Sequence, residues 1–433
     1  MNQWTESLWG DESFSALAIQ RPLVEMFGVV MRDTAPPLFY LVGWGWGRMF
    51  GYSEVALRSL TLLLVVGASI FAALTVYHLK RDKVVAGLAF ALAAGSPFLF
   101  QFAFEWRMYA LLAFTISASN YFFISRRWGG YIVATLAAVY THHFALFTVA
   151  SQLGWFILFD LNWTKPRVWL SQLRPFIVVG LLYLPWLYPM YLQIARVKGG
   201  GFWLGKPTVK EAATVLVQFF TGGVAQRLRW LVAIVGGVLV LGKDWRKLGR
   251  SWLQIAVVFL FPVIIAFAVS YVVTPIFYDR YLLSVVVGMV ILIAVGTPRK
   301  LAPLLVGLVL FYGYISWQQF THPHKRPFRD LAAYVQMVVS PQDLLINYNG
   351  QAHHLWETKY YGLTAPIYTP NGPLPFYTGT AQMTAADTIA VLPQVPRIGV
   401  ISSEPVAKVI LPGYKLSSLR QFGELSFSWW MLQ

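Results

Sequence analysis

Charged residues of the kinds that transfer a group to a hydroxyl recur along the chain, mostly beside apolar segments: Asp11, Glu12, Asp33, Arg58, Glu105, Arg107 and Arg280. A carboxylate can take the proton of an attacking hydroxyl, and a guanidinium can stabilise a phosphate that leaves. An adjacent Asp-Glu pair could instead cap a helix, because carboxylates accept backbone N–H bonds there. The recurrence at the ends of apolar segments favours chemistry, since charges held at a membrane face are costly.

These residues stand in a chain with the composition of a polytopic membrane protein. Of its 433 residues, 57% are hydrophobic and 12% are charged, whereas soluble domains carry roughly 25% charged residues. The net charge of +16 indicates basic cytoplasmic loops, and we expect no nucleic-acid partner. Because there is no cysteine, disulfides, thiolate metal sites and cysteine nucleophiles are excluded.

Hydropathy predicts about ten membrane crossings. They fall at about 55–79, 84–100, 108–124, twice within 130–160, and at 175–193, 229–242, 252–272, 281–297 and 301–319. The shorter apolar segment 35–50 predicts an interfacial or re-entrant helix. Basic clusters mark the cytoplasmic side under the positive-inside rule: Lys80-Arg81-Lys83, Arg126-Arg127, Lys165-Arg167-Arg174, Lys243-Arg246-Lys247-Arg250 and Arg299-Lys300.

The second and third basic clusters lie on one side, so the run 130–160 must cross twice and bend near Thr141, His142 and His143. Both ends of the chain then lie outside. We expect a transmembrane domain over 1–320, whose residues 1–54 form an external catalytic loop with interfacial helices. Residues 321–433 predict a small external α/β domain, with a helix in RPFRDLAAYVQMVV and strands in DLLINY, IAVLP and RIGVISS.

Several short motifs, in order and in matching places of the predicted topology, resemble family-39-type glycosyltransferases. They are Trp9-Gly10-Asp11-Glu12, Asp33-Thr-Ala-Pro-Pro-Leu, Phe50-Gly51-Tyr52-Ser53-Glu54 with Arg58, Ser96-Pro97, Glu105-x-Arg107-x-Tyr109, Tyr140-Thr141-His142 and Phe277-Tyr278-Asp279-Arg280-Tyr281. This family includes the dolichyl-phosphate-mannose–protein mannosyltransferases and the lipid A aminoarabinose transferase. The resemblance covers nearly the whole chain.

The resemblance implies an all-α polytopic membrane enzyme of the GT-C fold, in a bacterial-type inner membrane. Such an enzyme transfers a hexosyl or pentosyl group, with inversion, from a polyprenyl-phosphate donor to a lipid, glycan or protein acceptor on the external face. The resemblance makes Asp11 the catalytic base, with Glu12 beside it. The residues expected to bind substrate are Asp33, Arg58, Glu105, Arg107, Tyr109, His142, Arg280 and Tyr281. For Arg58, contact with lipid headgroups is an equal alternative.

The histidines leave a metal cofactor open. Glu12, Glu105 and His142 could hold a divalent cation, but His142 and His143 could equally form a polar turn. His322, His324, His353 and His354 show no ligand spacing with carboxylates, so we interpret them as surface or turn residues. The chain has no Gly-rich phosphate loop, which disfavours a nucleotide-sugar donor.

Two departures from the family concern the start of the chain and residue 35. Relatives have a transmembrane helix ahead of the Asp-Glu pair, so we expect eleven spans if a first helix is missing here. Many relatives carry a His where this chain has Ala35. The alternative function is a flippase for a polyprenyl-linked glycan or lipid, or a secondary transporter; either predicts charges in the middle of the spans. A ligase that moves a whole glycan also remains open.

Overall fold

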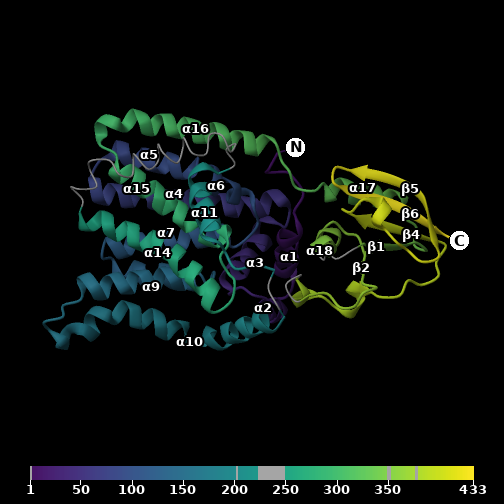
Figure 1. The fold of residues 1–433 in the computed structure, drawn as a ribbon, viewed down its shortest axis with the longest axis horizontal. Helices are drawn as coiled ribbons and strands as arrows, with labels where there is room; N and C mark the ends of the chain where they lie inside the picture. The colour runs from purple at the N-terminus through teal and green to yellow at the C-terminus, as the bar shows by residue number, and fades with distance from the viewer. Residues whose placement is uncertain (1, 201–202, 223–248, 349–352, 376–378) are drawn as a thin grey trace.

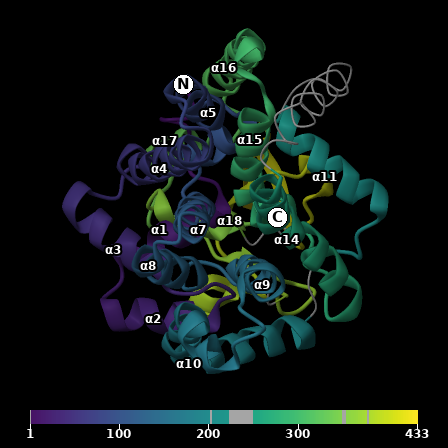
Figure 2. The ribbon, with the colours of Figure 1, turned by 90° about the vertical axis from the view of Figure 1, so that its left-hand side faces the viewer.

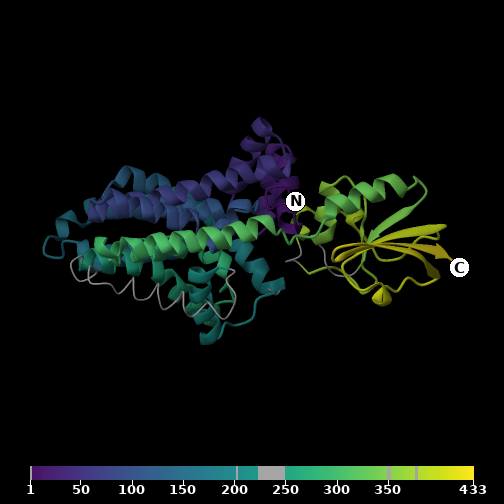
Figure 3. The ribbon, with the colours of Figure 1, turned by 90° about the horizontal axis from the view of Figure 1, so that it is seen from above.

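The computed structural model describes residues 2–200, 203–222, 249–348, 353–375 and 379–433. Its helices form one long bundle, and a small domain of helices and strands follows it along the same axis (Figure 1). Seen from above, the N-terminal segment lies where the bundle meets this tail domain (Figure 3). The all-α fold class with a C-terminal α/β domain is therefore confirmed.

The described helices of the bundle are α1 Gly10–Gln20, α2 Leu23–Arg32, α3 Leu38–Phe50, α4 Glu54–Lys80, α5 Lys83–Ala94, α6 Pro97–Gln101, α7 Tyr109–Ile124, α8 Trp128–Val139, α9 Ala145–Trp155, α10 Trp169–Gly200, α11 Val209–Thr221, α14 Arg250–Val272, α15 Ser284–Gly296 and α16 Ala302–Thr321. Most of them overlap the predicted apolar segments, whereas α11 was not predicted and α10 runs beyond 175–193. The run 130–160 bends between α8 and α9, at the Thr141-His142-His143 break.

Within the described residues, four helices are long and apolar enough to cross a membrane: α4, α10, α14 and α16. A fifth span results if α5 and α6, bent by 50° at Ser96, count as one. The apolar stretches of α10 and α16 are only 33% and 22% buried by protein, so their large apolar side chains need lipid around them. The count of ten crossings stays a prediction, because 229–242, Lys243, Arg246 and Lys247 lie outside the described residues.

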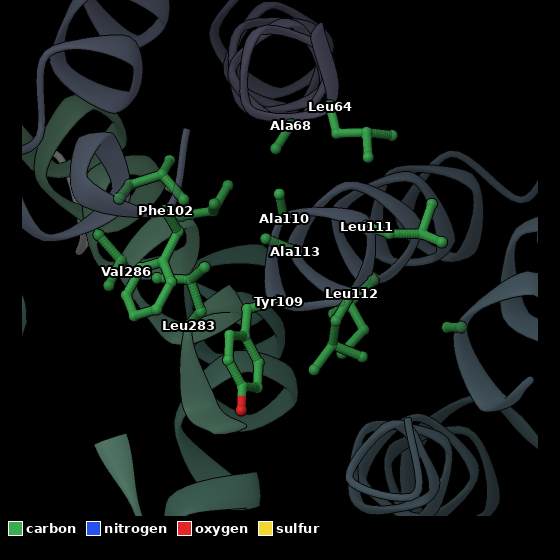
Figure 4. Close-up of a cluster of buried hydrophobic side chains, with 14 of the residues drawn as sticks. Leu64, Ala68, Phe102, Tyr109, Ala110, Leu111, Leu112, Ala113, Leu283 and Val286 are labelled. Carbon is green, nitrogen blue, oxygen red and sulfur yellow. The ribbon is translucent and has the colours of Figure 1, made fainter. Parts of the chain in front are cut away.

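The centre of the bundle is α7, which α4, α8, α9 and α15 surround in the end-on view (Figure 2). Ala68 of α4 faces Ala110 and Ala113 of α7 (Figure 4), and a Cβ added at Gly67 would lie 2.7 Å from the Phe114 ring. Such small residues let membrane helices approach closely. The start of α7 is therefore held rigidly, which positions Arg107 and Tyr109.

A buried polar network ties α7 to the α8–α9 hairpin. Gln152 of α9 donates to Asn120 Oδ1 at 2.7 Å and to Ser119 Oγ at 3.0 Å, and it accepts from the Tyr131 hydroxyl at 3.0 Å. Side-chain hydrogen bonds of this kind hold helices together where lipid surrounds them. The backbone N–H of Leu38 also donates to the Tyr140 carbonyl at 2.9 Å, so α3 is fastened to the turn that carries His142.

The tail domain is a six-stranded sheet with helices packed against it. Helices α17 Phe328–Val338 and α18 His353–Tyr360 accompany strands β1 Leu344–Asn347, β2 Ile367–Tyr368, β3 Thr388–Ile389, β4 Arg397–Ser402, β5 Tyr414–Phe422 and β6 Leu425–Leu432. The order is β3-β2-β1-β4-β6-β5; β3, β2, β1 and β4 pair in parallel, and β6 is antiparallel to β4 and β5. The predicted helix and the strands in DLLINY and RIGVISS are present as α17, β1 and β4. The strand predicted in IAVLP is wrong beyond Ile389, since β3 ends there, and the β5–β6 hairpin was not predicted.

Candidate active site

Helix α1 places the Asp-Glu pair at the junction of the bundle and the tail domain. Its first turn holds both carboxylates, and Glu12 Oε2 accepts the Trp9 backbone N–H at 3.1 Å, which caps the helix start. Gly10 is required by packing: a Cβ there would lie 2.3 Å from His353 Cβ and 3.0 Å from His353 Cα. The absence of a side chain at residue 10 therefore allows α18 to lie directly against α1.

The Asp11 carboxylate is surrounded by positive charge without being hydrogen-bonded to it. Its Oδ2 lies 3.8 Å from both Arg107 Nη2 and Arg280 Nη1. Its Oδ1 lies 3.7 Å from His353 Nδ1, and the side chain is 26% exposed. Burial raises the pKa of Asp11, but the charge of Arg107, that of His353 when its imidazole is protonated, and the charge of Arg280 outweigh it, so the net pKa is lowered. Asp11 is thus an ionised carboxylate with free lone pairs.

Glu12 has the opposite environment, although it is the next residue. Its side chain is fully buried; Oε2 lies 3.2 Å from Arg58 Nη2 and 3.0 Å from Lys325 Nζ. Oε1 accepts the Trp106 backbone N–H at 2.7 Å. Burial raises the pKa of Glu12, and the Lys325 and Arg58 charges with the Trp106 bond lower it further than burial raises it. Both oxygens are engaged, so Glu12 is built into the scaffold.

Arg58 lies with Glu12 rather than with Asp11. It is fully buried, and its guanidinium donates to the backbone carbonyls of Gln3 at 3.0 Å, Glu6 at 2.6 Å and Ser7 at 3.2 Å. Five N–H donors in a fixed fork suit this task, because they hold a loop in one conformation. The geometry therefore gives Arg58 a positioning role at the N-terminal segment instead of the phosphate contact that we expected.

Aromatic rings extend the Asp11 cluster toward the α8–α9 turn. Arg280 Nη2 donates to the Tyr278 hydroxyl at 2.7 Å, and its guanidinium carbon lies 5.7 Å from the centre of the Tyr109 ring. The Tyr281 ring lies 6.0 Å from the Tyr109 ring and 5.0 Å from the His142 ring. Tyr109 points its hydroxyl away from the apolar cluster at the centre of the bundle (Figure 4). The structure thus brings together residues that stand more than 100 positions apart in the sequence.

His142, in the turn between α8 and α9, is neutral. Burial lowers its pKa to about 3, with smaller contributions from the charges of His143 and Arg107. His142 Nδ1 accepts the Phe144 backbone N–H at 3.2 Å, which leaves the proton on Nε2. In this tautomer His142 is a hydrogen-bond donor.

Two further carboxylates, Asp33 and Glu105, lie at the edge of the Asp11 cluster. Asp33 Oδ2 accepts the Tyr40 hydroxyl at 3.2 Å, and Glu105 is 7% exposed with no partner for Oε1 among the described residues. Burial raises the pKa of both groups more than the nearby arginines lower it. Unlike Glu12, neither carboxylate lies in an ion pair with two cations among the described residues.

A metal site is not assembled from the three candidates. Within the described ranges, no group of three or more His, Asp or Glu side chains lies close enough together to hold a metal ion. Glu12 is engaged by Arg58 and Lys325, and His142 carries its proton on Nε2. These residues therefore do not fit a resident divalent cation.

Two residues of the site were missed in the sequence. His353 contacts Asp11 although its side chain is 40% exposed, and His354 beside it is fully buried, so the expectation that the tail histidines are surface or turn residues is wrong for His354. Lys325, between α16 and α17, reaches Glu12 from 313 residues away. Neither position has a periodic or motif signal; only the pairing of His353 with His354 distinguished the former.

Comparison with solved structures identifies ArnT from Cupriavidus metallidurans. The chain superposes on ArnT in the apo state with a TM-score of 0.66 at 13% sequence identity, covering 99% of this chain and 95% of that chain. For ArnT bound to undecaprenyl phosphate the TM-score is 0.58 at 13% identity, covering 99% and 96%. No protein-family model and no curated protein sequence matches the chain. The shared architecture confirms the predicted GT-C fold.

Proposed function

We propose that the chain is an integral inner-membrane glycosyltransferase that moves one sugar from a polyprenyl-phosphate donor to an acceptor hydroxyl on the external face. Asp11 takes the acceptor proton while the acceptor oxygen attacks the anomeric carbon. The bond between that carbon and the donor phosphate breaks on the opposite side, so the configuration inverts. The support from structural likeness is an ArnT fold of which one structure is bound to undecaprenyl phosphate.

The observation that carries the proposal is the position of Asp11 between two guanidinium groups. Arg107 and Arg280 each lie 3.8 Å from the same carboxylate oxygen, at the end of a bundle of apolar helices. A base for the acceptor and cations for the leaving phosphate are what this reaction needs at one place. A flippase does not need a carboxylate base there.

The two arginines also make the base dependent on the donor. Without a phosphate, they lower the pKa of Asp11 against the effect of burial, so the carboxylate is ionised but weakly basic. A bound phosphate draws the guanidinium groups toward its own oxygens. The pKa of Asp11 then rises, and the base becomes effective when a donor is in place.

An apolar cavity of about 450 Å³ suits the polyprenyl chain. It lies between α2, α3, α8 and α10 and is lined by Phe27, Pro37, Leu38, Leu41, Leu136, Ala137, Tyr140, Pro185 and Trp186. Tyr140 and Pro37 belong to the motifs that carry His142 and Asp33. An isoprenoid chain in this cavity would therefore have its phosphate end near the charged cluster.

The test uses the purified full chain in nanodiscs with radiolabelled polyprenyl-phosphate sugars, both hexosyl and aminopentosyl, and an extract of envelope lipids as acceptor. We expect transfer of label to the extract by the wild type. Asp11→Asn should lower the rate by about 10³-fold, within the range for a lost general base. The matched control is Asp330→Asn, since Asp330 is an exposed aspartate of α17 and should leave the rate unchanged.

Two results would contradict the proposal. Undiminished transfer by Asp11→Asn would remove Asp11 as the base. Translocation of a labelled polyprenyl lipid across proteoliposomes, without transfer from any donor, would favour the flippase.

A further inference from the structure

We infer that His353, contributed by the tail domain, is the group that receives the proton from Asp11 and returns it to water. This inference rests on the proposed function, and it adds a residue from outside the transmembrane domain to the same site. His353 acts through Asp11, so it is a positioning residue for the base and does not touch the sugar.

The position of His353 is determined by backbone packing. The Gly10 Cα carries no side chain, and a Cβ there would overlap His353 Cβ at 2.3 Å. This contact between α1 and α18 leaves Nδ1 of the imidazole 3.7 Å from Asp11 Oδ1. That separation is longer than a hydrogen bond, but one water or a small shift closes it, as for many catalytic pairs without substrate.

Among the described groups that contact the Asp11 carboxylate, His353 is the one that can accept a proton. Arg107 and Arg280 are permanently charged, and Glu12 on the same helix is engaged by Arg58 and Lys325. His353 is also 40% exposed, compared with 12% for Arg107 and 21% for Arg280. A proton on its imidazole can therefore leave directly to solvent.

The surroundings of His353 contain few other charges. On α1 it faces Trp9, whose ring lies 6.3 Å from the imidazole, and the Asp11 carboxylate. On its own helix, His354 and Glu357 are both buried. Glu357 Oε2 has no partner among the described residues, and burial raises the pKa of this carboxyl well above its usual range. Asp11 is thus the carboxylate that His353 contacts.

The proton balance of the reaction gives His353 its task. The acceptor hydroxyl loses its proton to Asp11 as the new C–O bond forms, and the donor leaves as polyprenyl phosphate. Asp11 then holds a proton that its two arginines disfavour, because they stabilise the charged carboxylate. Transfer of this proton to the His353 imidazole and on to water restores the carboxylate for the next turnover, with no other reactant.

The experiment compares wild type with His353→Ala under saturating labelled donor. Alanine keeps the Cα and Cβ that pack on Gly10, so α18 should stay in place. We expect kcat to fall about 10- to 100-fold while KM for the donor stays within about twofold. The dependence of kcat on pH should also differ between the two proteins, because only the wild type carries a proton acceptor at residue 353. Added imidazole should restore kcat, which a purely structural role would not allow.

The matched control is His324→Ala, because His324 is an exposed histidine of the segment between α16 and α17 and should change neither kcat nor the pH profile. If His353→Ala transfers sugar at the wild-type rate with the wild-type pH profile, the inference is overturned while the proposed function stands. If the wild type itself transfers no sugar, both are overturned.

Discussion

Asp11 and Glu12 are neighbours in the sequence, yet their surroundings differ in almost every respect. Asp11 is 26% exposed; Arg107 and Arg280 stand 3.8 Å from it and the His353 imidazole 3.7 Å. Glu12 is fully buried, with contacts of 2.7–3.2 Å to two cations and two backbone N–H groups. Asp11 has positive charge around it but keeps free lone pairs, whereas both oxygens of Glu12 are engaged.

Two neighbouring residues of one helical turn therefore differ in role: Asp11 is placed to react, and Glu12 holds the surrounding segments together. Successive residues of a helix point about 100° apart, so Asp11 faces the opening among Arg107, Arg280 and His353 while Glu12 faces the interior. A buried carboxylate with two buried cations is stable only when every partner is present. An acid–base group needs the reverse, namely room for a substrate atom. Changes at the two positions should therefore affect different measurements.

The largest effect on stability is expected for Glu12→Gln. Neutralising this carboxylate leaves Arg58 without its counter-charge and Lys325 with Glu6 alone, which costs about 3–5 kcal/mol for a buried pair. We expect a correspondingly lower unfolding temperature in detergent, measured by intrinsic tryptophan fluorescence. Asp11→Asn is the matched control and should lower the unfolding temperature much less, because its two arginine neighbours stand 3.8 Å away and it is 26% exposed. Equal losses for the two variants would remove the distinction.

The same comparison predicts how wild-type stability depends on pH. The folded-state pKa of Glu12 is lowered from 4.5, so its contribution is fully present above pH 4.5 and is lost as the pH falls through the folded value. Glu12→Gln should therefore lower the unfolding temperature strongly at pH 7 and much less near pH 3. A constant difference between the two pH values would contradict this.

Arg280→Gln should affect the rate more than the stability. Its guanidinium is 21% exposed and lies 3.8 Å from Asp11, so little folding energy depends on it, while the leaving phosphate would lose a cation. We expect a 10²- to 10³-fold lower kcat and an unfolding temperature close to wild type. Arg326→Gln is a suitable control, because Arg326 pairs with the exposed Glu424 at 3.6 Å.

The fold, and the arginines that surround Asp11, could be predicted from the sequence. Apolar runs and basic clusters predicted most of the helices, and the Thr141-His142-His143 interruption predicted the α8–α9 bend. Arg107 and Arg280 were singled out because charges at the ends of apolar segments are unusual. These signals are local, so hydropathy and motif order could find them.

The partners of Glu12 and the histidine beside Asp11 could not be predicted, because they depend on contacts across the whole chain. Lys325 and His353 reach α1 from the segment after the last helix of the bundle and from the tail domain, and no periodicity links such distant positions. Arg58 and Arg280 are both arginines, so the sequence could not show that Arg58 binds backbone carbonyls in residues 3–7 while Arg280 lies partly exposed beside Asp11. Residue type predicts the chemistry a side chain can do, whereas burial decides whether a ligand can reach it.

Gly10→Ala tests whether α18 must lie against the Asp11 side of α1. The new Cβ would meet His353 Cβ at 2.3 Å and His353 Cα at 3.0 Å, and because one of these is backbone, α18 has to move. We expect a loss of about 1–3 kcal/mol of stability, as for overpacking, together with a lower kcat. The control is Gly45→Ala, since a Cβ at Gly45 meets nothing within 4 Å.

Glu105→Gln should have the smallest effect on stability, and in the opposite direction to Glu12→Gln. Burial raises the pKa of Glu105 more than the Arg280 and Lys325 charges lower it, and Oε1 has no partner among the described residues. A raised folded-state pKa means that the folded chain binds a proton which the unfolded chain releases above pH 4.5. The wild type therefore loses stability as the pH rises from 4.5, and a neutral amide should avoid that loss.

We expect the free energy of unfolding of Glu105→Gln to be about 1 kcal/mol higher than that of the wild type at pH 8, and equal to it near pH 4. If Glu105→Gln is destabilised at pH 8 as Glu12→Gln is, Glu105 belongs to the scaffold. A stable variant with a slower transfer rate places Glu105 with Asp11, among the groups that are left open for substrate.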